Sequence, residues 1–297
     1  KITVPESWLN ARDNDSTIKE AEFIEKIMRP MESQKGNDLP VSVFKDREDG
    51  TFPSGSTAYE KRGIATTVPK WIDENCIQCN QCSYICPHAV IRPFVLTQDE
   101  ALKAPESFIT LDAKGKNLKD FKYRIQISPM DCTGCGNCAD ICPAPEKALV
   151  MEPISTQVEI QVKNWKYAIT EVKYKKDIVY NNTFKESQFK EPLIEFSGAC
   201  AGCGETPYIK LVTQLFGERM MIANATGCSS IWAASAPSTA YTTNYEGKGP
   251  SWANSLFEDN AEYGFGMYLG VKHMRDKIED SINALIKMDI DEKIKET

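Results

Sequence analysis

The chain has 297 residues, of which 41% are hydrophobic and 26% are charged, and its formal net charge is −7. This composition predicts an ordinary water-soluble protein with length for about two domains. An acidic chain lacks the basic face that binds phosphate backbones, so we exclude nucleic acid as a partner. We find no apolar run that could span a bilayer and no secretory signal, so we expect no membrane contact and a cytoplasmic location.

The first part of the chain predicts one helix and a long linker. Residues 1–16 are irregular and polar, and Thr17-Ile-Lys-Glu20 is a capping-box pattern that opens a helix. Pro30 is expected to end this helix. Glycines and prolines over 31–57 indicate a loop or wrapping linker, with a short edge strand at 41–44. The apolar face of the helix comprises Ile18, Ala21, Ile24 and Met28.

Two cysteine runs of identical spacing, C-x2-C-x2-C-x3-C-P, follow the linker. This is the bacterial ferredoxin pattern, which binds [4Fe–4S] clusters through thiolates. In two-cluster ferredoxins the fourth cysteine of each run ligates the other cluster. The spacing therefore predicts one cluster on Cys76, Cys79, Cys82 and Cys142, and a second on Cys132, Cys135, Cys138 and Cys86.

Zinc and disulfides are the two alternatives for these cysteines. A zinc ribbon also uses C-x2-C pairs, but it rarely has three cysteines followed by C-x3-C-P. The chain has 11 cysteines, an odd number, and closely spaced pairs suit a metal better than disulfides inside a cell. Many cysteines without an export signal fit a reducing, oxygen-poor interior.

The two runs are separated by a long insertion between Pro87 and Cys132. Thr97-Gln-Asp-Glu100 is expected to cap a short helix, and the alternation from Phe121 to Ile127 predicts a half-buried strand. The insertion is expected to shield a cluster or to dock on a neighbouring domain. Alternation at Val158, Ile160 and Val162 predicts a further strand.

Residues inside the cysteine runs suggest how the clusters are surrounded. Gly134 and Gly136 permit close backbone approach, and their N–H groups can donate to sulfide. His88 is interpreted as a packing or surface residue, because cysteine already fills every ligand position. We expect Ile77, Ile85 and Ile141 to exclude water.

After a lysine-rich connector at 163–192, the pattern is that of an α/β domain. Thr206 is expected to cap a helix that has Pro207 at its first position, and Met220–Ala223 to form a buried strand. The loop that follows this strand carries Cys228. In α/β proteins, ligands bind at the carboxyl ends of strands, which is where this loop lies. The helix that begins at Thr206 has one apolar face, made of Ile209, Val212, Leu215 and Phe216. A second helix within 259–288 is expected to pack on a core through Val271, Met274, Ile278, Ile282 and Leu285.

The remaining cysteines, Cys200, Cys203 and Cys228, are one short of a cubane site. The alternative is that they are three unconnected structural cysteines, since a free cysteine is often a small buried hydrophobe.

The motifs together resemble one family. The double ferredoxin run is followed by Ala-Cys200-Ala-Gly-Cys203-Gly-Glu205-Thr-Pro-Tyr and by Ala-Thr-Gly-Cys228-Ser-Ser-Ile-Trp. Next come Pro250-Ser-Trp-Ala-Asn-Ser-Leu-Phe-Glu-Asp-Asn-Ala-Glu262 and Gly264-Phe-Gly266. Over essentially its whole length, the sequence resembles the large single-chain pyruvate:ferredoxin (flavodoxin) oxidoreductases.

The resemblance implies an activity and a set of cofactors. The family decarboxylates pyruvate on thiamine diphosphate with Mg²⁺, transfers the acetyl group to coenzyme A, and passes electrons through three [4Fe–4S] clusters to ferredoxin or flavodoxin. It implies that Cys200, Cys203 and Cys228 ligate the proximal cluster, that Glu205 and Cys228 contact thiamine diphosphate, and that the full-length enzyme is a homodimer. The eight ferredoxin-type cysteines would then hold the medial and distal clusters. The resemblance assigns no catalytic residue to this chain.

Departures from the family pattern shape the expected organisation. The fourth proximal ligand and the Gly-Asp-Gly metal motif of the thiamine site are missing, and the chain starts at Lys1 rather than methionine. We therefore expect an internal segment of a longer enzyme, inactive alone, with an α+β fold. Its predicted parts are the end of a preceding domain (1–16), a linker (17–57), a 2[4Fe–4S] ferredoxin-like domain (58–172), and the first part of an α/β thiamine-diphosphate-binding domain (173–297).

Two other functions remain open. The chain could be a ferredoxin-type electron-transfer subunit, although a carrier needs neither the Cys200–Cys228 constellation nor a second unit. It could also belong to an oxidoreductase for another 2-oxoacid, because the substrate pocket is absent from the sequence.

Overall fold

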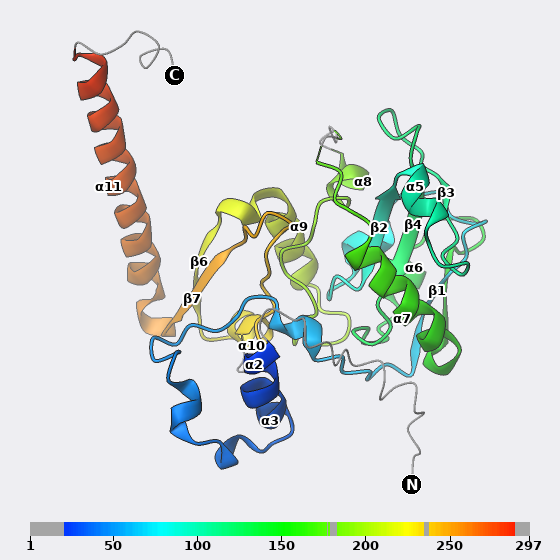
Figure 1. Cartoon of the computed structure of the whole chain (residues 1–297), viewed down its shortest axis with the longest axis horizontal. Coiled ribbons are helices and arrows are strands. Elements are labelled where there is room, and N and C mark those ends of the chain that lie inside the picture. Colours follow the sequence, from blue (N-terminus) through cyan, green and yellow to red (C-terminus); the bar gives the residue numbers. More distant parts are fainter. Residues whose placement is uncertain (1–20, 177, 179–182, 235–237, 289–297) are drawn as a thin grey trace. The chain divides into compact units, whose positions relative to one another are not determined.

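A computed structural model describes residues 21–176, 178, 183–234 and 238–288. The chain divides into two compact units, which are described separately (Figure 1). Residues up to Met220, together with Ile231–Pro250, form the first unit, and Met221–Ser230 with the residues from Ser251 onward form the second. Among the described helices, none combines the length and apolarity needed to cross a bilayer.

The first described element is a helix that continues through Pro30. It comprises α2 (Ala21–Phe23), a π-helical turn η1 (Ile24–Met28) and α3 (Arg29–Glu32), so the prediction that Pro30 ends the helix is wrong. The Arg29 N–H bonds the carbonyl of Ile24, and this wider turn directly precedes the residue that has no N–H to donate. Ile24 and Met28 are buried as expected, whereas Thr17–Glu20 lie outside the described residues.

The linker that follows contains short 3-10 turns. These are η2 (Gly36–Asp38), η3 (Val41–Phe44) and η4 (Ser56–Tyr59). The edge strand predicted at 41–44 is therefore wrong: η3 bends this segment so that Val43 and Phe44 pack on the buried face of the preceding helix, while Val41 stays exposed.

The first unit contains two small antiparallel sheets (Figure 1). In one, β1 (Thr67–Trp71) pairs with β5 (Leu149–Pro153), with Trp71 opposite Leu149. In the other, β4 (Lys122–Ile127) lies between β2 (Ile91–Leu96) and β3 (Leu111–Asp112), with Ile91 opposite Ile127. Strand β1 precedes the first cysteine run in the sequence and β5 follows the second, so their pairing joins the two ends of the segment that carries both runs.

The expected capping box is confirmed at α5 (Gln98–Leu102). Thr97 Oγ1 accepts from the Glu100 N–H at 3.2 Å, and the Glu100 carboxylate accepts from the Thr97 N–H at 2.7 Å. The strand predicted at 121–127 is also confirmed, but its half-buried character is wrong. Arg124 and Gln126 on its second face are 4% and 0% exposed, because further elements pack on that face.

One of those elements is α7 (Ile154–Thr170), which occupies the segment predicted as a strand. The strand prediction is wrong because the buried residues recur with helical spacing and include polar ones. Gln161 in α7 accepts from the Gln126 amide at 2.7 Å, whereas Ile160 is 49% exposed. The buried face of α7 comprises Ile154, Gln157, Val158, Gln161, Asn164, Trp165 and Ala168.

The first unit also contains α8 (Phe184–Ser187), α9 (Thr206–Phe216) and the turn η5 (Gly217–Arg219). Glu205 occupies the cap position of α9, one residue before the predicted Thr206. On the predicted apolar face of α9, Val212, Leu215 and Phe216 are exposed. The buried face of α9 is polar instead and carries Lys210, Thr213 and Gln214, each hydrogen-bonded to main-chain atoms of other segments.

The second unit has a strand pair and a long helix. β6 (Met221–Ala225) pairs in parallel with β7 (Ser251–Ser255), and α11 (Asn260–Ile286) follows the turn η6 (Phe257–Asp259). α10 (Cys228–Ala234) begins in this unit. The predicted strand and helix are confirmed, but their predicted burial is wrong: Met221, Met274, Ile278, Ile282 and Leu285 are each about half exposed, since so few described elements of this unit can cover them.

Candidate iron–sulfur and cofactor sites

A first cavity brings together cysteines from both runs. Its walls include Cys76, Cys79, Cys82 and, from the second run, Cys142. Trp71 lines the same cavity, and its buried indole N–H lacks a hydrogen-bond partner among the described residues. This is the crossed set of four that the spacing predicts.

A second cavity is lined by the complementary set. Cys132, Cys135 and Cys138 face it together with Cys86 of the first run. His88 also lines it and is buried as a packing residue; its Nδ1 lies 3.1 Å from the Ser197 carbonyl, and its Nε2 lacks a partner among the described residues. Each cavity therefore has four thiols and one unpartnered ring nitrogen in its wall.

Short helices bring the two runs together. α4 (Gln81–Ile85) carries Cys82 and ends at Cys86, so its two ends belong to different cavities. α6 (Asn137–Asp140) occupies the matching place in the second run. The helices α4 and α6 pack on each other, which explains how each fourth cysteine reaches the opposite cavity.

Both loops need left-handed backbone at the same two places. In the second run Gly134 and Gly136 have φ of 72° and 82°, as glycine permits. In the first run the matching positions are Gln78 and Asn80, with φ of 60° and 62°. The sequence reasoning recognised the glycines but missed this pair, because glutamine and asparagine carry no such signal when the partners that hold them are unknown.

The long insertion and a later segment supply those partners. The Gln78 amide donates to the Asp112 carbonyl at 2.8 Å and accepts from the Lys114 N–H at 2.8 Å. The Asn80 amide accepts from the Tyr123 hydroxyl and donates to the Lys185 carbonyl, both at 2.8 Å. The insertion thus contacts the first cysteine loop directly.

The electrostatics of the cavities suit a positively charged inorganic core better than bare thiolates. Burial raises the pKa of Cys132 to about 12 and also raises the pKa of Cys138 strongly. Two N–H groups point at sulfur, from Gly134 to Cys132 Sγ and from Ala148 to Cys142 Sγ, both at 3.4 Å. Among the described residues, no three of His, Cys, Asp or Glu converge closely enough to hold a single metal ion.

The isoleucines contribute less than expected. Ile77 lines the first cavity but is 48% exposed, and Ile141 is 39% exposed. Ile85 is half-buried against the main core. Residues of sheet strands also line the cavities: Trp71 and Tyr123 line the first and Met151 the second.

The remaining predicted site residues lie in both units. Cys200 and Cys203 flank a turn in the first unit, where a Cβ on Gly202 would lie 3.7 Å from Cys135 Cβ. Glu205 accepts from the buried indole N–H of Trp232 at 3.1 Å, a partner that the sequence did not reveal. Cys228 is exposed at the start of α10 in the second unit, after the end of β6, as predicted.

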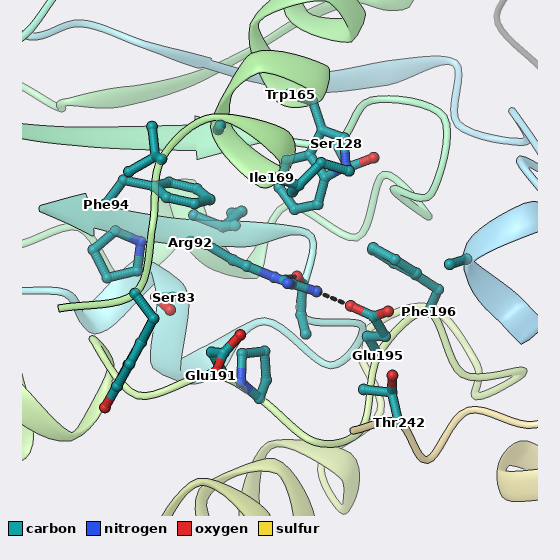
Figure 2. Close-up of a pocket in the computed structure, with 18 of the residues that line it drawn as sticks. Ser83, Arg92, Phe94, Ser128, Trp165, Ile169, Glu191, Glu195, Phe196 and Thr242 are labelled. Atoms are coloured by element: carbon teal, nitrogen blue, oxygen red, sulfur yellow. Dashed lines mark hydrogen bonds and ion pairs between the residues drawn. The ribbon is translucent and has the colours of Figure 1, made fainter. Parts of the chain in front are cut away.

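A cavity of about 570 Å³ in the first unit has no cysteine in its lining (Figure 2). Arg92 lies between the rings of Trp165 and Phe196 and pairs with Glu195. Other cations in its wall are also engaged; Lys175, for example, pairs with Glu100 at 2.8 Å. Because carboxylates of the protein pair with Arg92 and Lys175, we assign this cavity no ligand.

Two family models match the chain. Residues 75–145 match a 4Fe-4S dicluster domain, which spans both cysteine runs and the insertion. Residues 11–65 match the EKR domain, a domain of unknown function, and this range contains the whole predicted linker. The chain therefore carries an iron–sulfur domain with an α+β fold.

Curated relatives align with nearly the whole chain. Over 97% of its length it is 54% identical to a pyruvate:ferredoxin oxidoreductase of Moorella thermoacetica. Over 96% of its length it is 55% identical to a pyruvate-flavodoxin oxidoreductase of Enterobacter agglomerans. The aligned segment is 24% of each of these two relatives. The chain is 53% identical over 95% to the mitochondrial pyruvate dehydrogenase [NADP(+)] of Euglena gracilis, of which it covers 15%. The chain spans about a quarter of the length of the first two. The chain is thus homologous, over nearly its entire length, to one segment of the pyruvate:ferredoxin and pyruvate-flavodoxin oxidoreductases.

Proposed function

We propose that this chain is the electron-transfer segment of a pyruvate:ferredoxin or pyruvate-flavodoxin oxidoreductase and holds two [4Fe–4S] clusters in its ferredoxin-like domain. The observation that carries the proposal is the pair of cavities, each lined by three cysteines of one run and the fourth cysteine of the other. Such clusters accept and donate single electrons. The ligand sets are Cys76, Cys79, Cys82 and Cys142, and Cys132, Cys135, Cys138 and Cys86.

The chain's own residues orient the thiols and restrict water. Left-handed residues in each loop turn the backbone around the cavity, and the N–H groups of Gly134 and Ala148 donate to cysteine sulfur. Hydrogen bonds to sulfur and burial are the protein's means of setting the potential of a cluster. The insertion adds rigidity, because Tyr123 and Asp112 hold the first loop.

A third cluster and the thiamine site form the finer part of the proposal. Cys200, Cys203 and Cys228 would ligate a proximal cluster, and Glu205 and Cys228 would contact thiamine diphosphate, which is held with Mg²⁺. The support is the match of these residues to the family motifs. The contact of Gly202 with Cys135 further suggests that the cluster held by the second run is the neighbour of this loop.

The activity proposed for the whole enzyme is the oxidation of pyruvate with coenzyme A to acetyl-coenzyme A and CO2, in a homodimer. The names of the relatives point to three electron acceptors: ferredoxin, flavodoxin and NADP(+). Because the same segment occurs in all three, we propose that it delivers electrons toward an acceptor that other parts of the enzyme select. We favour ferredoxin or flavodoxin, since the corresponding relatives are covered to the larger extent.

Anaerobic reconstitution of the chain tests this proposal. We expect about eight iron atoms per chain, from two four-iron sites, and a reduced EPR spectrum with two interacting paramagnets. A double Cys79→Ala, Cys135→Ala variant is the matched negative control, because it removes one ligand from each set. Tight binding of one zinc ion per run, with no cluster formed, would overturn the proposal.

A further inference from the structure

Lys210 is a buried cation bound to the end of the helix that joins the two cysteine cavities. It comes from α9, and its side chain is 2% exposed. Its ammonium donates to the main-chain carbonyls of Ser83, Tyr84 and Cys86, the last two at 3.1 Å. An ammonium has three donors and no acceptor, so three carbonyls match its protonated form.

The helix that Lys210 contacts carries ligands of both proposed clusters. Helix α4 carries Cys82 of one ligand set and ends at Cys86 of the other. A nearby anionic cluster would further favour the charged lysine.

The second run has a matching lysine in a different environment. Lys147 donates to the carbonyls of Asp140 and Cys142, both at 2.8 Å, which are the counterparts of Tyr84 and Cys86. Lys147 is exposed and lies five residues from Cys142, whereas Lys210 is buried and lies 124 residues from Cys86. The same carbonyl contact is therefore made once in solvent and once in the interior.

We infer that Lys210 is an electrostatic tuning residue, which raises the reduction potentials of both clusters of the ferredoxin-like domain. Reduction adds one negative charge to a cluster, and a fixed cation nearby stabilises that charge. A cation changes the reduction potential strongly only where water is excluded, since solvent screens an exposed charge such as that of Lys147. Because the donor belongs to α9, correct docking of that helix would set the potentials.

This inference rests on the proposed binding of two clusters, so iron content and potential are measured on the same samples. The chain is reconstituted anaerobically as wild type, Lys210→Met, Lys210→Gln, Lys210→Arg and Lys147→Met. Each cluster is then titrated potentiometrically and followed by EPR. Gln keeps a hydrogen-bond donor without the charge, Arg keeps the charge, and Lys147→Met removes the matching exposed lysine.

We expect both neutral Lys210 variants to retain eight iron atoms and to shift both midpoints to more negative values. The expected shift is about tenfold in the reduction equilibrium, which is 59 mV for a one-electron couple. Lys210→Arg should keep most of the wild-type potential. Lys147→Met should change the reduction equilibrium by less than about threefold, because exposed charges are screened.

Iron-loaded variants with unchanged midpoint potentials, or an equal shift in Lys147→Met, would overturn the inference and leave the proposed function intact. Loss of iron in both neutral variants would make Lys210 a structural requirement instead, whereas absence of clusters from the wild type would refute the proposed function itself.

Discussion

The indole N–H of Trp232 donates to a carboxylate oxygen of Glu205 across 3.1 Å, and the indole is buried while Glu205 is exposed. Trp232 therefore fixes the direction of a carboxylate that we propose contacts thiamine diphosphate. We expect Trp232→Phe in the full-length enzyme to weaken thiamine diphosphate binding roughly tenfold, about 1.4 kcal/mol, the scale of one hydrogen bond to a charged group. Equilibrium titration with the cofactor measures this.

Tyr241→Phe is the control for that experiment. Tyr241 lies beside Trp232, with ring centroids 6.3 Å apart, so the substitution perturbs the same packing without removing the indole donor. Cofactor affinity should stay near that of the wild type. If both variants weaken binding equally, the effect comes from packing, and Glu205 has no directed role.

The crossed arrangement of ligands predicts which cluster each fourth cysteine controls. Cys86→Ala should remove the cluster whose other three ligands are in the second run, and Cys142→Ala the cluster of the first run. The reason is that each fourth thiol faces the opposite cavity. EPR and iron analysis of the two single variants measure the outcome. Loss of the cluster in the same run would contradict the crossing.

Gly134 and Gly136 allow backbone strain to be separated from steric clash. Both have positive φ, so alanine costs about 1 kcal/mol at either position through left-handed backbone alone. At Gly134 the new Cβ would also lie 3.0 Å from the Thr67 carbonyl, whereas at Gly136 it would meet nothing within 4 Å. We expect Gly134→Ala to lower cluster occupancy clearly and Gly136→Ala to lower it little. Equal losses, measured as iron per chain, would mean that strain alone matters.

Arg124 is expected to contribute strongly to stability although it is a buried charge. Its guanidinium lies 4.3 Å from the ring centroid of Phe108 and 5.5 Å from that of Trp71, and it donates to Gln126 and to the Ile109 carbonyl. Burial lowers its pKa to about 10, so it stays charged at neutral pH. Arg124→Met removes the donor to the buried Gln126 amide oxygen and to the Ile109 carbonyl, at about 3 kcal/mol.

The conservative variant distinguishes charge from geometry at this site. Arg124→Lys retains the charge but loses the planar group that stacks between the two rings, so we expect an intermediate loss of stability. The measurement is Tm of the reconstituted protein under anaerobic conditions. A Tm for Arg124→Met equal to that of the wild type would show that the acceptors find other partners.

Spacing determined the chemistry of the ferredoxin-like domain. The interval between cysteines is short and local, so C-x2-C-x2-C-x3-C-P places three thiols on one turn in any context. The capping box at Thr97 and Glu100 is equally local, and it is found as predicted. Local hydrogen bonds and ligand spacing need no knowledge of the rest of the fold.

Tertiary structure decided the features that depend on what packs against a segment. The apolar alternation at 158–162 favoured a strand, yet this segment is part of α7, because Gln161 is buried against Gln126 and Ile160 faces solvent. Periodicity counts apolar residues, so it fails where buried positions are polar and paired. Lys210 is the same case: its burial depends on three carbonyls about 125 positions away, and a lysine in a helix gives no sign of them until the chain has folded.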